Sequence, residues 1–221
     1  MPEVAQVVLD PRRTLTYRFC ARLVAVLSFF WFRPEVEGAE NIPLSGPVII
    51  APIHRSNIDF ALSLFISKRK IFFMAKDGLF KFKPLGWLLL RLGAFPVKRG
   101  SADREAMALA EAALAQGQAL LMFPEGTRLA GPTVEPLRDG AMFIEARAGA
   151  KVVPVGIAGS DHAMGEGSKT IRRAKIYVVV GEPIEPPNSE GRVSRSAIAE
   201  KTEELRQKLE ATYQESLRKL S

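Results

Sequence analysis

The 221-residue chain is predicted to fold as an α/β domain, with a mixed, mostly parallel central sheet flanked by helices and preceded by an N-terminal interfacial helix. Short apolar runs, which are typical of buried strands, alternate along the chain with stretches of helical periodicity. Glycine and proline are scattered between these runs, and no low-complexity linker or repeat divides the chain. We therefore expect residues 1–33 to form a lead-in and interface helix, and residues 34–221 to form one domain.

The N-terminal helix is predicted over residues 14–32, TLTYRFCARLVAVLSFFWF, and it grows more apolar towards its end. Its uninterrupted apolar part is shorter than the roughly 20 residues that span a bilayer, and Arg18 and Arg22 interrupt its first half. An interfacial helix is therefore expected, and a helix simply packed on the domain is the alternative. A signal peptide is not favoured, because no small-residue cleavage site follows. Residues 1–13 are expected to be a poorly ordered lead-in.

The first strand and helix of the domain follow in order. Residues 47–52, PVIIAP, form a short apolar run suited to a buried strand. A helix is expected over 57–66, with Ser56 or Asn57 as its N-cap. The run IFFMA, residues 71–75, is the next buried strand.

The middle of the chain contains two helices and two strands. A proline in the first turn and a glycine just past the end predict a short helix over 84–92. Residues 94–97 are expected to form an edge strand, because Pro96 cannot donate to a ladder. The alanine-rich segment 103–116 stops at a glycine and is a helix. Strand 119–123 follows it.

The last third of the chain continues the alternation. A helix is expected from Gly140 to Ala148, with Gly149 as its stop. Strands follow over 152–157 and 175–180. Residues 194–220 carry apolar side chains at helical spacing between mixed charges, which predicts an amphipathic helix that covers the domain.

The net charge of +7 is concentrated in one segment. Between residues 68 and 104 there are ten Lys or Arg and two Asp, an excess of eight, so the rest of the chain is close to neutral. Bulky apolar residues lie between these charges, which is typical of a protein that binds an anionic membrane surface. Binding to single-stranded nucleic acid is the alternative. It is not favoured, because no RNA-binding signature is present and the run LGWLLLRLGAF is too apolar for a base-stacking platform.

Cofactor and metal chemistry find little support in the sequence. The single cysteine, Cys20, excludes an internal disulfide, and one cysteine with two distant histidines does not suit a zinc site. No glycine-rich dinucleotide fingerprint or P-loop is present. We therefore expect no cofactor and no metal.

The stretch HRSNID contains a candidate catalytic pair. His54 precedes the predicted 57–66 helix, and Asp59 falls in its first turns, where a carboxylate can reach back to the imidazole. Such a carboxylate fixes the tautomer and supports the imidazolium. No serine stands out as a nucleophile, and Cys20 suits packing, so the pair would deprotonate a substrate hydroxyl directly. The alternative is a capping aspartate beside an ordinary histidine. The second histidine, His162, lies in a flexible-looking loop and is expected to be incidental or a rim contact.

The second candidate loop is FPEGTR, residues 123–128, which follows a predicted strand. Ligands of open α/β sheets bind at the carboxyl ends of strands. The planar donor fork of Arg128 suits a phosphate. Glu125 could accept hydrogen bonds from a hydroxylated substrate, and Gly126 allows close backbone approach. The alternative is a Glu–Arg pair that only holds a turn.

Taken together, HRSNID and FPEGTR, about seventy residues apart, resemble the glycerolipid acyltransferase family, whose common bacterial members are PlsC-like 1-acyl-sn-glycerol-3-phosphate acyltransferases. His54 and Asp59 match the first motif of the family, and FPEGTR matches the third in full. GAFPVKR, residues 93–99, matches the second loosely, and VVPVGI, residues 152–157, matches the fourth. The resemblance covers Pro47 to about Gly159.

The resemblance implies transfer of a fatty acyl chain from acyl-CoA or acyl carrier protein to the free hydroxyl of lysophosphatidic acid, giving phosphatidic acid in phospholipid biosynthesis. It implies that His54 is the general base and that Asp59 orients it. The implied acceptor-binding residues are Arg99, Glu125, Gly126, Thr127 and Arg128, and Pro154 with its neighbours would line the acyl side. It also implies a peripheral protein at the cytoplasmic face of the cell membrane.

The second motif departs from the family pattern at Pro96 and Lys98, which puts the acceptor in doubt more than the reaction class. The same acyl transfer to another lipid, glycosylated or carrying an amino acid, is therefore an alternative. The segment of residues 68–104 leaves a further alternative, a non-catalytic membrane-binding or nucleic-acid-binding protein. The residues of the 14–32 helix are only a partial counterpart of the family's two N-terminal membrane-binding helices.

Overall fold

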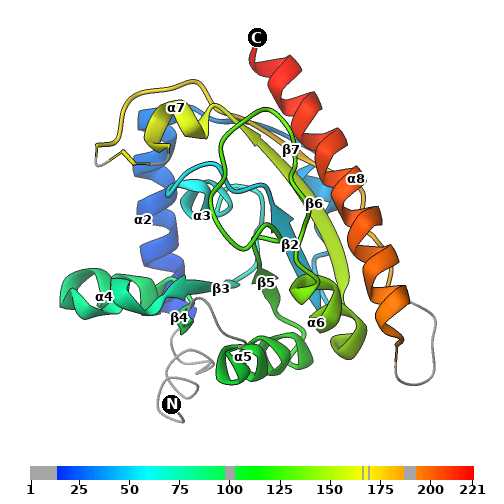
Figure 1. Cartoon of the computed structure of the whole chain (residues 1–221). Coiled ribbons are helices and arrows are strands. Elements are labelled where there is room, and N and C mark those ends of the chain that lie inside the picture. The colour runs from blue at the N-terminus through cyan, green and yellow to red at the C-terminus, as the bar shows by residue number, and fades with distance from the viewer. Residues whose placement is uncertain (1–13, 98–102, 166, 169, 187–192) are drawn as a thin grey trace.

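The computed structural model describes residues 14–97, 103–165, 167–168, 170–186 and 193–221 (Figure 1). These residues form a seven-stranded sheet of order β1-β7-β6-β2-β5-β3-β4. The strands are β1 (Glu35–Glu37), β2 (Val48–Pro52), β3 (Ile71–Lys76), β4 (Ala94–Val97), β5 (Ala119–Leu121), β6 (Lys151–Ala158) and β7 (Tyr177–Val180). Strands β6, β2, β5, β3 and β4 are parallel, whereas β7 is antiparallel to β6. The predicted α/β class with a mixed, mostly parallel sheet is confirmed.

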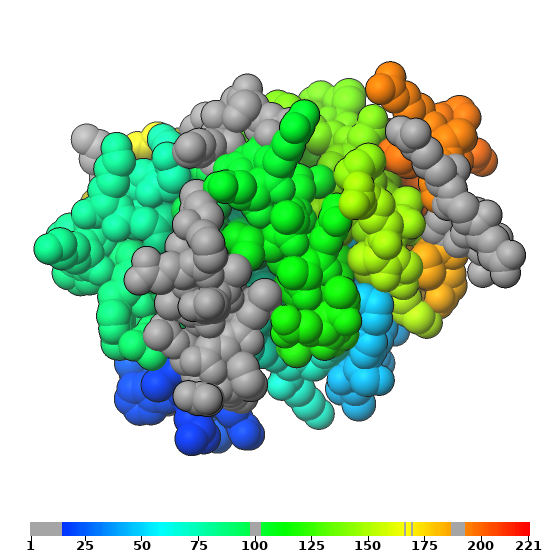
Figure 2. Space-filling view, turned by 90° about the horizontal axis from the view of Figure 1, so that it is seen from below, coloured from blue at the N-terminus to red at the C-terminus, as the bar shows by residue number. Residues whose placement is uncertain are grey.

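Helices cover both faces of the sheet. The helices are α2 (Thr14–Phe32), α3 (Asp59–Leu62), α4 (Lys83–Arg91), α5 (Arg104–Ala115), α6 (Gly140–Ala148), α7 (Ser160–Met164) and α8 (Arg195–Leu220), with 3-10 turns η2 (Ala39–Asn41) and η3 (Asp77–Lys81). Neighbouring residues of β2 face opposite layers, as a strand buried on both sides requires. Ile50 packs in the cluster that contains residues of α2 and α3, whereas Ile49 packs with α5 and α6. Seen from below, α5 lies at the centre of the surface, with α4 on one side and α6 on the other (Figure 2).

Helix α8 packs directly on β6 and β7, where glycines allow a close approach (Figure 1). A Cβ atom on Gly156 would lie 2.3 Å from the carbonyl oxygen of Thr212 in α8. Just after the end of β7, a Cβ on Gly181 would lie 2.7 Å from the Thr212 methyl group and 3.0 Å from the ring of Pro154. The glycine of the VVPVGI stretch therefore has a packing role, and the predicted covering helix is confirmed.

The predicted end signals are mostly confirmed. Two N-caps were not predicted: Asp103 and Ser194, expected as the first residues of their helices, instead cap α5 and α8 by accepting hydrogen bonds from the Ala106 and Ala197 N–H groups. Gly149 ends α6 in the left-handed conformation, with φ 58°. Strand β4, which contains Pro96, lies at the edge of the sheet as expected.

Helix α2 has the predicted bounds, and one side of it is packed on the domain. Tyr17, Cys20 and Phe32 are buried, and the Ile71 N–H donates to the Tyr17 hydroxyl at 3.0 Å. By length and composition, residues 15–32 could cross a membrane, a test that core helices and N-terminal signal sequences also pass. Length therefore does not decide between a crossing helix and an interfacial one.

Three expectations need correction or fall outside the structure. The helix expected over 57–66 is only the four residues of α3, and neither Ser56 nor Asn57 is its N-cap, which is Ile58. The helix starts late because the Asp59 carboxylate accepts the N–H groups of the preceding loop, and after Leu62 the chain continues in turns with bonds from the Leu64 and Phe65 N–H groups to the carbonyl oxygens three residues before them. The loop expected around His162 contains a short helix, α7. The expected lead-in, residues 1–13, lies outside the described residues.

Candidate active site

The two candidate loops meet because their strands are neighbours in the sheet. Strands β2 and β5 are parallel, with Val48 opposite Ala119, so both end at the same edge. His54 lies two residues after the end of β2, and Glu125 lies four residues after the end of β5. A crevice at the carboxyl ends of parallel strands is where open α/β sheets place their ligands.

His54 and Asp59 form a hydrogen-bonded pair. The Nδ1 atom of His54 lies 3.0 Å from Asp59 Oδ2, and Asp59 is fully buried. The same carboxylate oxygen accepts hydrogen bonds from the backbone N–H groups of Arg55 and Ser56, at 2.8 and 2.7 Å. The loop is thus wrapped around one carboxylate oxygen, which holds the imidazole in a fixed direction. Because Nδ1 faces Asp59, Nε2 is the nitrogen left to accept a proton from a substrate.

The His54 ring is also held by an aromatic side chain from the other loop. The ring of Phe123 is stacked on the imidazole, with 3.8 Å between centroids and 20° between planes. The His54 carbonyl oxygen accepts a hydrogen bond from the Leu129 N–H at 3.1 Å. Phe123 of the FPEGTR segment and Leu129, the residue that follows it, therefore contact the ring and the backbone of His54.

Glu125 joins the two loops, and its arginine partner is Arg55 of the other loop rather than Arg128, the partner in the alternative of a Glu–Arg pair within the motif. Its Oε2 accepts the His54 backbone N–H at 2.9 Å, and both of its oxygens accept from Arg55 Nη1, at 2.8 and 2.9 Å. Glu125 and Arg55 are 3% and 2% exposed, so the ion pair is shielded from water. Binding of a hydroxylated substrate by Glu125 stays a prediction.

Sequence reasoning missed Arg55. Its guanidinium donates to Glu125 and to the carbonyl oxygens of Gly131 and Thr133, the latter two at 3.2 and 2.7 Å. The signal that could have found Arg55 was its place between a buried strand and the aspartate of the candidate pair. A charged residue there is expected to be buried, and a buried arginine requires an anionic partner. The position of that partner depends on strand order, which the motif spacing does not reveal.

The rest of the FPEGTR loop is open to solvent. Gly126 has φ 72° and is exposed, as is Thr127, whereas Arg128 is half-buried. A Cβ on Gly126 would lie 2.5 Å from the side chain of Arg138, a second exposed arginine that sequence reasoning did not select. The loop therefore favours glycine at this position because of its left-handed backbone conformation.

Of the remaining predicted site residues, Pro154 is not brought to this pair, and Arg99 cannot be placed. Pro154 lies inside β6, opposite Ala51, and its ring packs towards Gly181. His162 is exposed on α7, 4.0 Å from Asp161. Arg99 lies outside the described residues. Among the residues that the structure describes, no group of three or more His, Cys, Asp or Glu side chains could hold a metal ion.

Comparison with known proteins decides the family. The Acyltransferase family model matches residues 33–158, which is more than half of the chain. The chain belongs to the Acyltransferase family. The matched segment contains the His54–Asp59 pair, the FPEGTR loop and strand β6, and it ends before α8 begins.

Relatives named as acyltransferases are similar to this chain in sequence, and one solved structure is similar in fold. A chloroplastic 1-acyl-sn-glycerol-3-phosphate acyltransferase of Arabidopsis thaliana is 30% identical over 79% of this chain and 50% of its own length. A 1-acyl-sn-glycerol-3-phosphate acyltransferase of Bacillus subtilis is 29% identical over 87% of this chain and 94% of its own. The crystal structure of PlsC, the 1-acyl-sn-glycerophosphate acyltransferase of Thermotoga maritima, superposes with a TM-score of 0.73 at 26% identity, over 94% of this chain and 80% of that chain. The chain thus spans about half the length of the plant relatives and nearly all of the bacterial one.

Proposed function

We propose that the protein transfers a fatty acyl chain from acyl-CoA or acyl carrier protein to the free hydroxyl of 1-acylglycerol-3-phosphate, giving phosphatidic acid. The observation that carries this proposal is the His54–Asp59 pair, 3.0 Å apart, at the carboxyl edge of an acyltransferase-family sheet. The names of the relatives at 29–30% identity support the choice of acceptor.

In the proposed reaction, His54 Nε2 takes the proton of the acceptor hydroxyl while the hydroxyl oxygen attacks the thioester carbonyl carbon. Asp59 stabilises the resulting imidazolium through Nδ1. Collapse of the tetrahedral intermediate breaks the carbon–sulfur bond, and the departing thiolate takes the proton back from His54. No enzyme nucleophile takes part, which agrees with the burial of the one cysteine, Cys20, in α2.

The acceptor phosphate is proposed to bind beside the FPEGTR loop. Arg128 is half-buried there and Gly126 leaves the backbone accessible, so a guanidinium fork can meet phosphate oxygens close to the histidine. Arg99 and Thr127 are proposed as further contacts by family resemblance. Pro154 and its neighbours stay a proposal for the acyl side.

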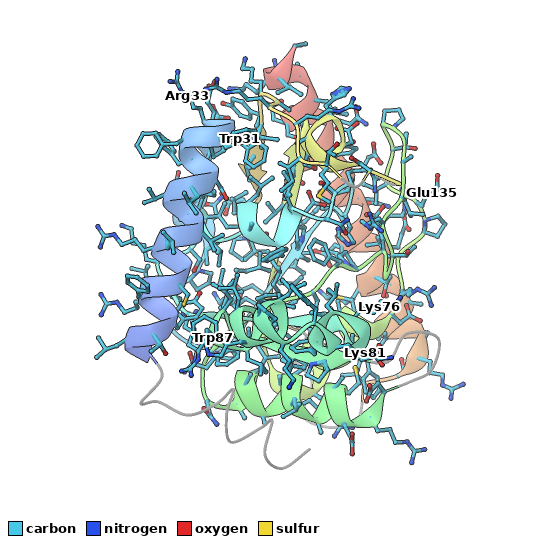
Figure 3. The ribbon with its side chains drawn as sticks, turned by 90° about the vertical axis from the view of Figure 1, so that its left-hand side faces the viewer. Trp31, Arg33, Lys76, Lys81, Trp87 and Glu135 are labelled. Carbon is cyan, nitrogen blue, oxygen red and sulfur yellow. The ribbon has the colours of Figure 1, made fainter. Side chains whose placement is uncertain are left out.

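The acceptor and product are lipids, and we propose that α2 and α4 bind the protein to the cytoplasmic face of an anionic membrane. Opposite its packed side, α2 exposes apolar residues at helical spacing, among them Leu15, Phe19, Leu27 and Phe30 at 76, 70, 61 and 68%. Figure 3 shows Trp31 on α2 and Trp87 on α4, whereas Lys76 and Lys81 lie on the opposite side of the view from Trp87. Exposed arginines on α2 add cations suited to anionic head groups.

The test is an acceptor panel with purified protein on anionic vesicles. 1-Acylglycerol-3-phosphate, a lysoglycolipid and an amino-acid lysolipid are each supplied with acyl-CoA and, separately, with acyl carrier protein. Turnover of 1-acylglycerol-3-phosphate above the other acceptors is expected. Turnover of another lipid alone would replace the acceptor but keep the reaction, and no acyl transfer in any arm would reject the proposed function.

A further inference from the structure

Three side chains on one face of α8 hold the loop that follows FPEGTR. Glu210 Oε2 accepts the Val134 N–H at 2.6 Å, the Tyr213 hydroxyl donates to the Gly131 carbonyl oxygen at 3.2 Å, and Gln214 Nε2 donates to the Pro132 carbonyl oxygen at 2.6 Å. Residues spaced three and four apart lie on one side of a helix, so the three hydrogen bonds come from a single face of α8. Gln214 Nε2 also donates to Glu210 Oε1 at 2.7 Å, so two of the three side chains hold each other in place. We call residues 131–134 the clamp loop.

The clamp loop in turn holds Arg55. The Nε atom of Arg55 donates to the Gly131 carbonyl oxygen, and its Nη2 atom donates to the Thr133 carbonyl oxygen. The guanidinium carbon also lies 5.2 Å from the centre of the Tyr213 ring, within cation–π distance. A planar guanidinium uses fixed donor directions, so the positions of these carbonyl groups set its orientation.

Arg55 in turn holds the backbone of His54, the catalytic candidate, both directly and through Glu125. Its Nη1 donates to the His54 carbonyl oxygen at 3.2 Å and to both oxygens of Glu125. Glu125 accepts the His54 backbone N–H at 2.9 Å. Both backbone polar groups of His54 are therefore fixed through this ion pair and the FPEGTR loop, while Asp59 fixes the ring.

We propose that the C-terminal half of α8 positions His54 for catalysis, with Tyr213 and Gln214 as positioning residues that act through the clamp loop and Arg55. This proposal rests on the proposed function, in which His54 is the base. It assigns a role in the reaction to α8, which lies outside the segment matched by the family model. Burial raises the pKa of Tyr213, which keeps its hydroxyl protonated as the donor to the clamp loop.

Two conservative variants test the proposal. Tyr213→Phe removes the donor but keeps the ring over Arg55, and Gln214→Ala removes an exposed amide that has no packing role in the core. Each is expected to lower kcat about 3- to 10-fold, the scale of one lost hydrogen bond, with KM for both substrates unchanged. Gln207→Ala is the matched control on the same helix, because Gln207 bonds only Glu203 within α8 among its described contacts. It should turn over at the wild-type rate.

Two further readouts separate positioning from general stability. Arg55→Lys combined with Gln214→Ala should lower kcat by less than the product of the single effects, because both act on one chain of contacts. In a His162→Gln background, His54 is the one histidine left, and its imidazole NMR signal should shift in Gln214→Ala but not in Gln207→Ala. Additive kcat effects with an unchanged His54 signal would overturn the proposal. If the wild type turns over no acceptor, the proposed function fails, and the His54 signal alone decides whether α8 positions the ring.

Discussion

Arg55 and Glu125, from loops 70 residues apart in sequence, form an ion pair whose side chains are 1% and 0% exposed. The pair joins the segment that carries the candidate base to the FPEGTR loop. Because a buried charge without its partner is strongly destabilising, the pair makes the two loops depend on each other.

Glu125→Gln should therefore destabilise the fold as well as the site. It keeps the shape of the side chain but leaves the Arg55 guanidinium buried without an anion, which is expected to lower the free energy of unfolding by about 3–5 kcal/mol. Chemical denaturation measures this value. The control is Glu111→Gln, which breaks the solvent-accessible Glu111–Arg147 pair and should change stability by less than about 1 kcal/mol. Equal effects of the two variants would contradict the central place of the Arg55–Glu125 pair.

Asp59→Asn should reduce acyl transfer sharply while leaving substrate binding intact. The amide cannot support an imidazolium as a carboxylate does, so kcat is expected to fall about 10²–10⁴-fold with little change in KM. The chain offers a matched control in Asp161→Asn, which alters the exposed aspartate next to His162. Steady-state kinetics that gave the two variants the same kcat would count against the orienting role of Asp59.

Glu145 should make stability depend on pH. This carboxyl group in α6 is 1% exposed, its Oε1 has no hydrogen-bond partner among the described residues, and burial raises its pKa to about 7. A carboxyl group with a raised pKa in the folded state binds more protons folded than unfolded, so stability falls as pH rises from about 4.5 to 7 and then levels off. The loss is on the order of 2–3 kcal/mol.

Glu145→Gln, which cannot ionise, should remove that slope. Urea denaturation at pH 5 and pH 8 would show a larger difference for the wild type than for the variant. Glu200→Gln alters an exposed glutamate that lines the same cavity of about 250 Å³ and should keep the wild-type slope. A slope that survives Glu145→Gln would assign the pH dependence to another group.

The exposed side of α2 should govern membrane binding. Phe19→Ser with Phe30→Ser removes two of its largest apolar side chains, and binding to anionic vesicles in a flotation assay is expected to weaken about tenfold or more. Phe143→Ser alters a partly exposed aromatic residue on α6 and should bind like the wild type. Undiminished flotation of the double variant would remove α2 from the membrane contact.

Local sequence signals predicted most of the fold because they reflect local physics. Apolar runs marked the strands, and glycines such as Gly117 and Gly149 marked helix ends with little dependence on the rest of the chain. Helix α3 is shorter than predicted because Asp59 binds the N–H groups of the preceding loop and the chain after Leu62 continues in turns, and helical periodicity reports neither. Strand β1, Glu35–Glu37, carries no apolar run and exists through pairing with β7.

In the candidate site, too, the local contact could be predicted from the sequence and the long-range contacts could not. The His54–Asp59 pair is separated by five positions and could be predicted from spacing. Arg55 could not, because its partners lie 70 to 78 residues away and meet it only once β2 and β5 are neighbours and α8 has fixed the clamp loop. The partners of the buried Arg55 could therefore be identified only from the structure.

The most direct test of the account compares the two histidines. His54→Ala and His162→Ala are assayed for acyl transfer to 1-acylglycerol-3-phosphate under saturating acyl donor, with folding checked by circular dichroism. If His54 is the general base, its loss lowers kcat by about 10²–10⁴-fold, whereas the exposed His162 can be lost with no more than a twofold change. Wild-type turnover by a folded His54→Ala protein would contradict the mechanism at its centre.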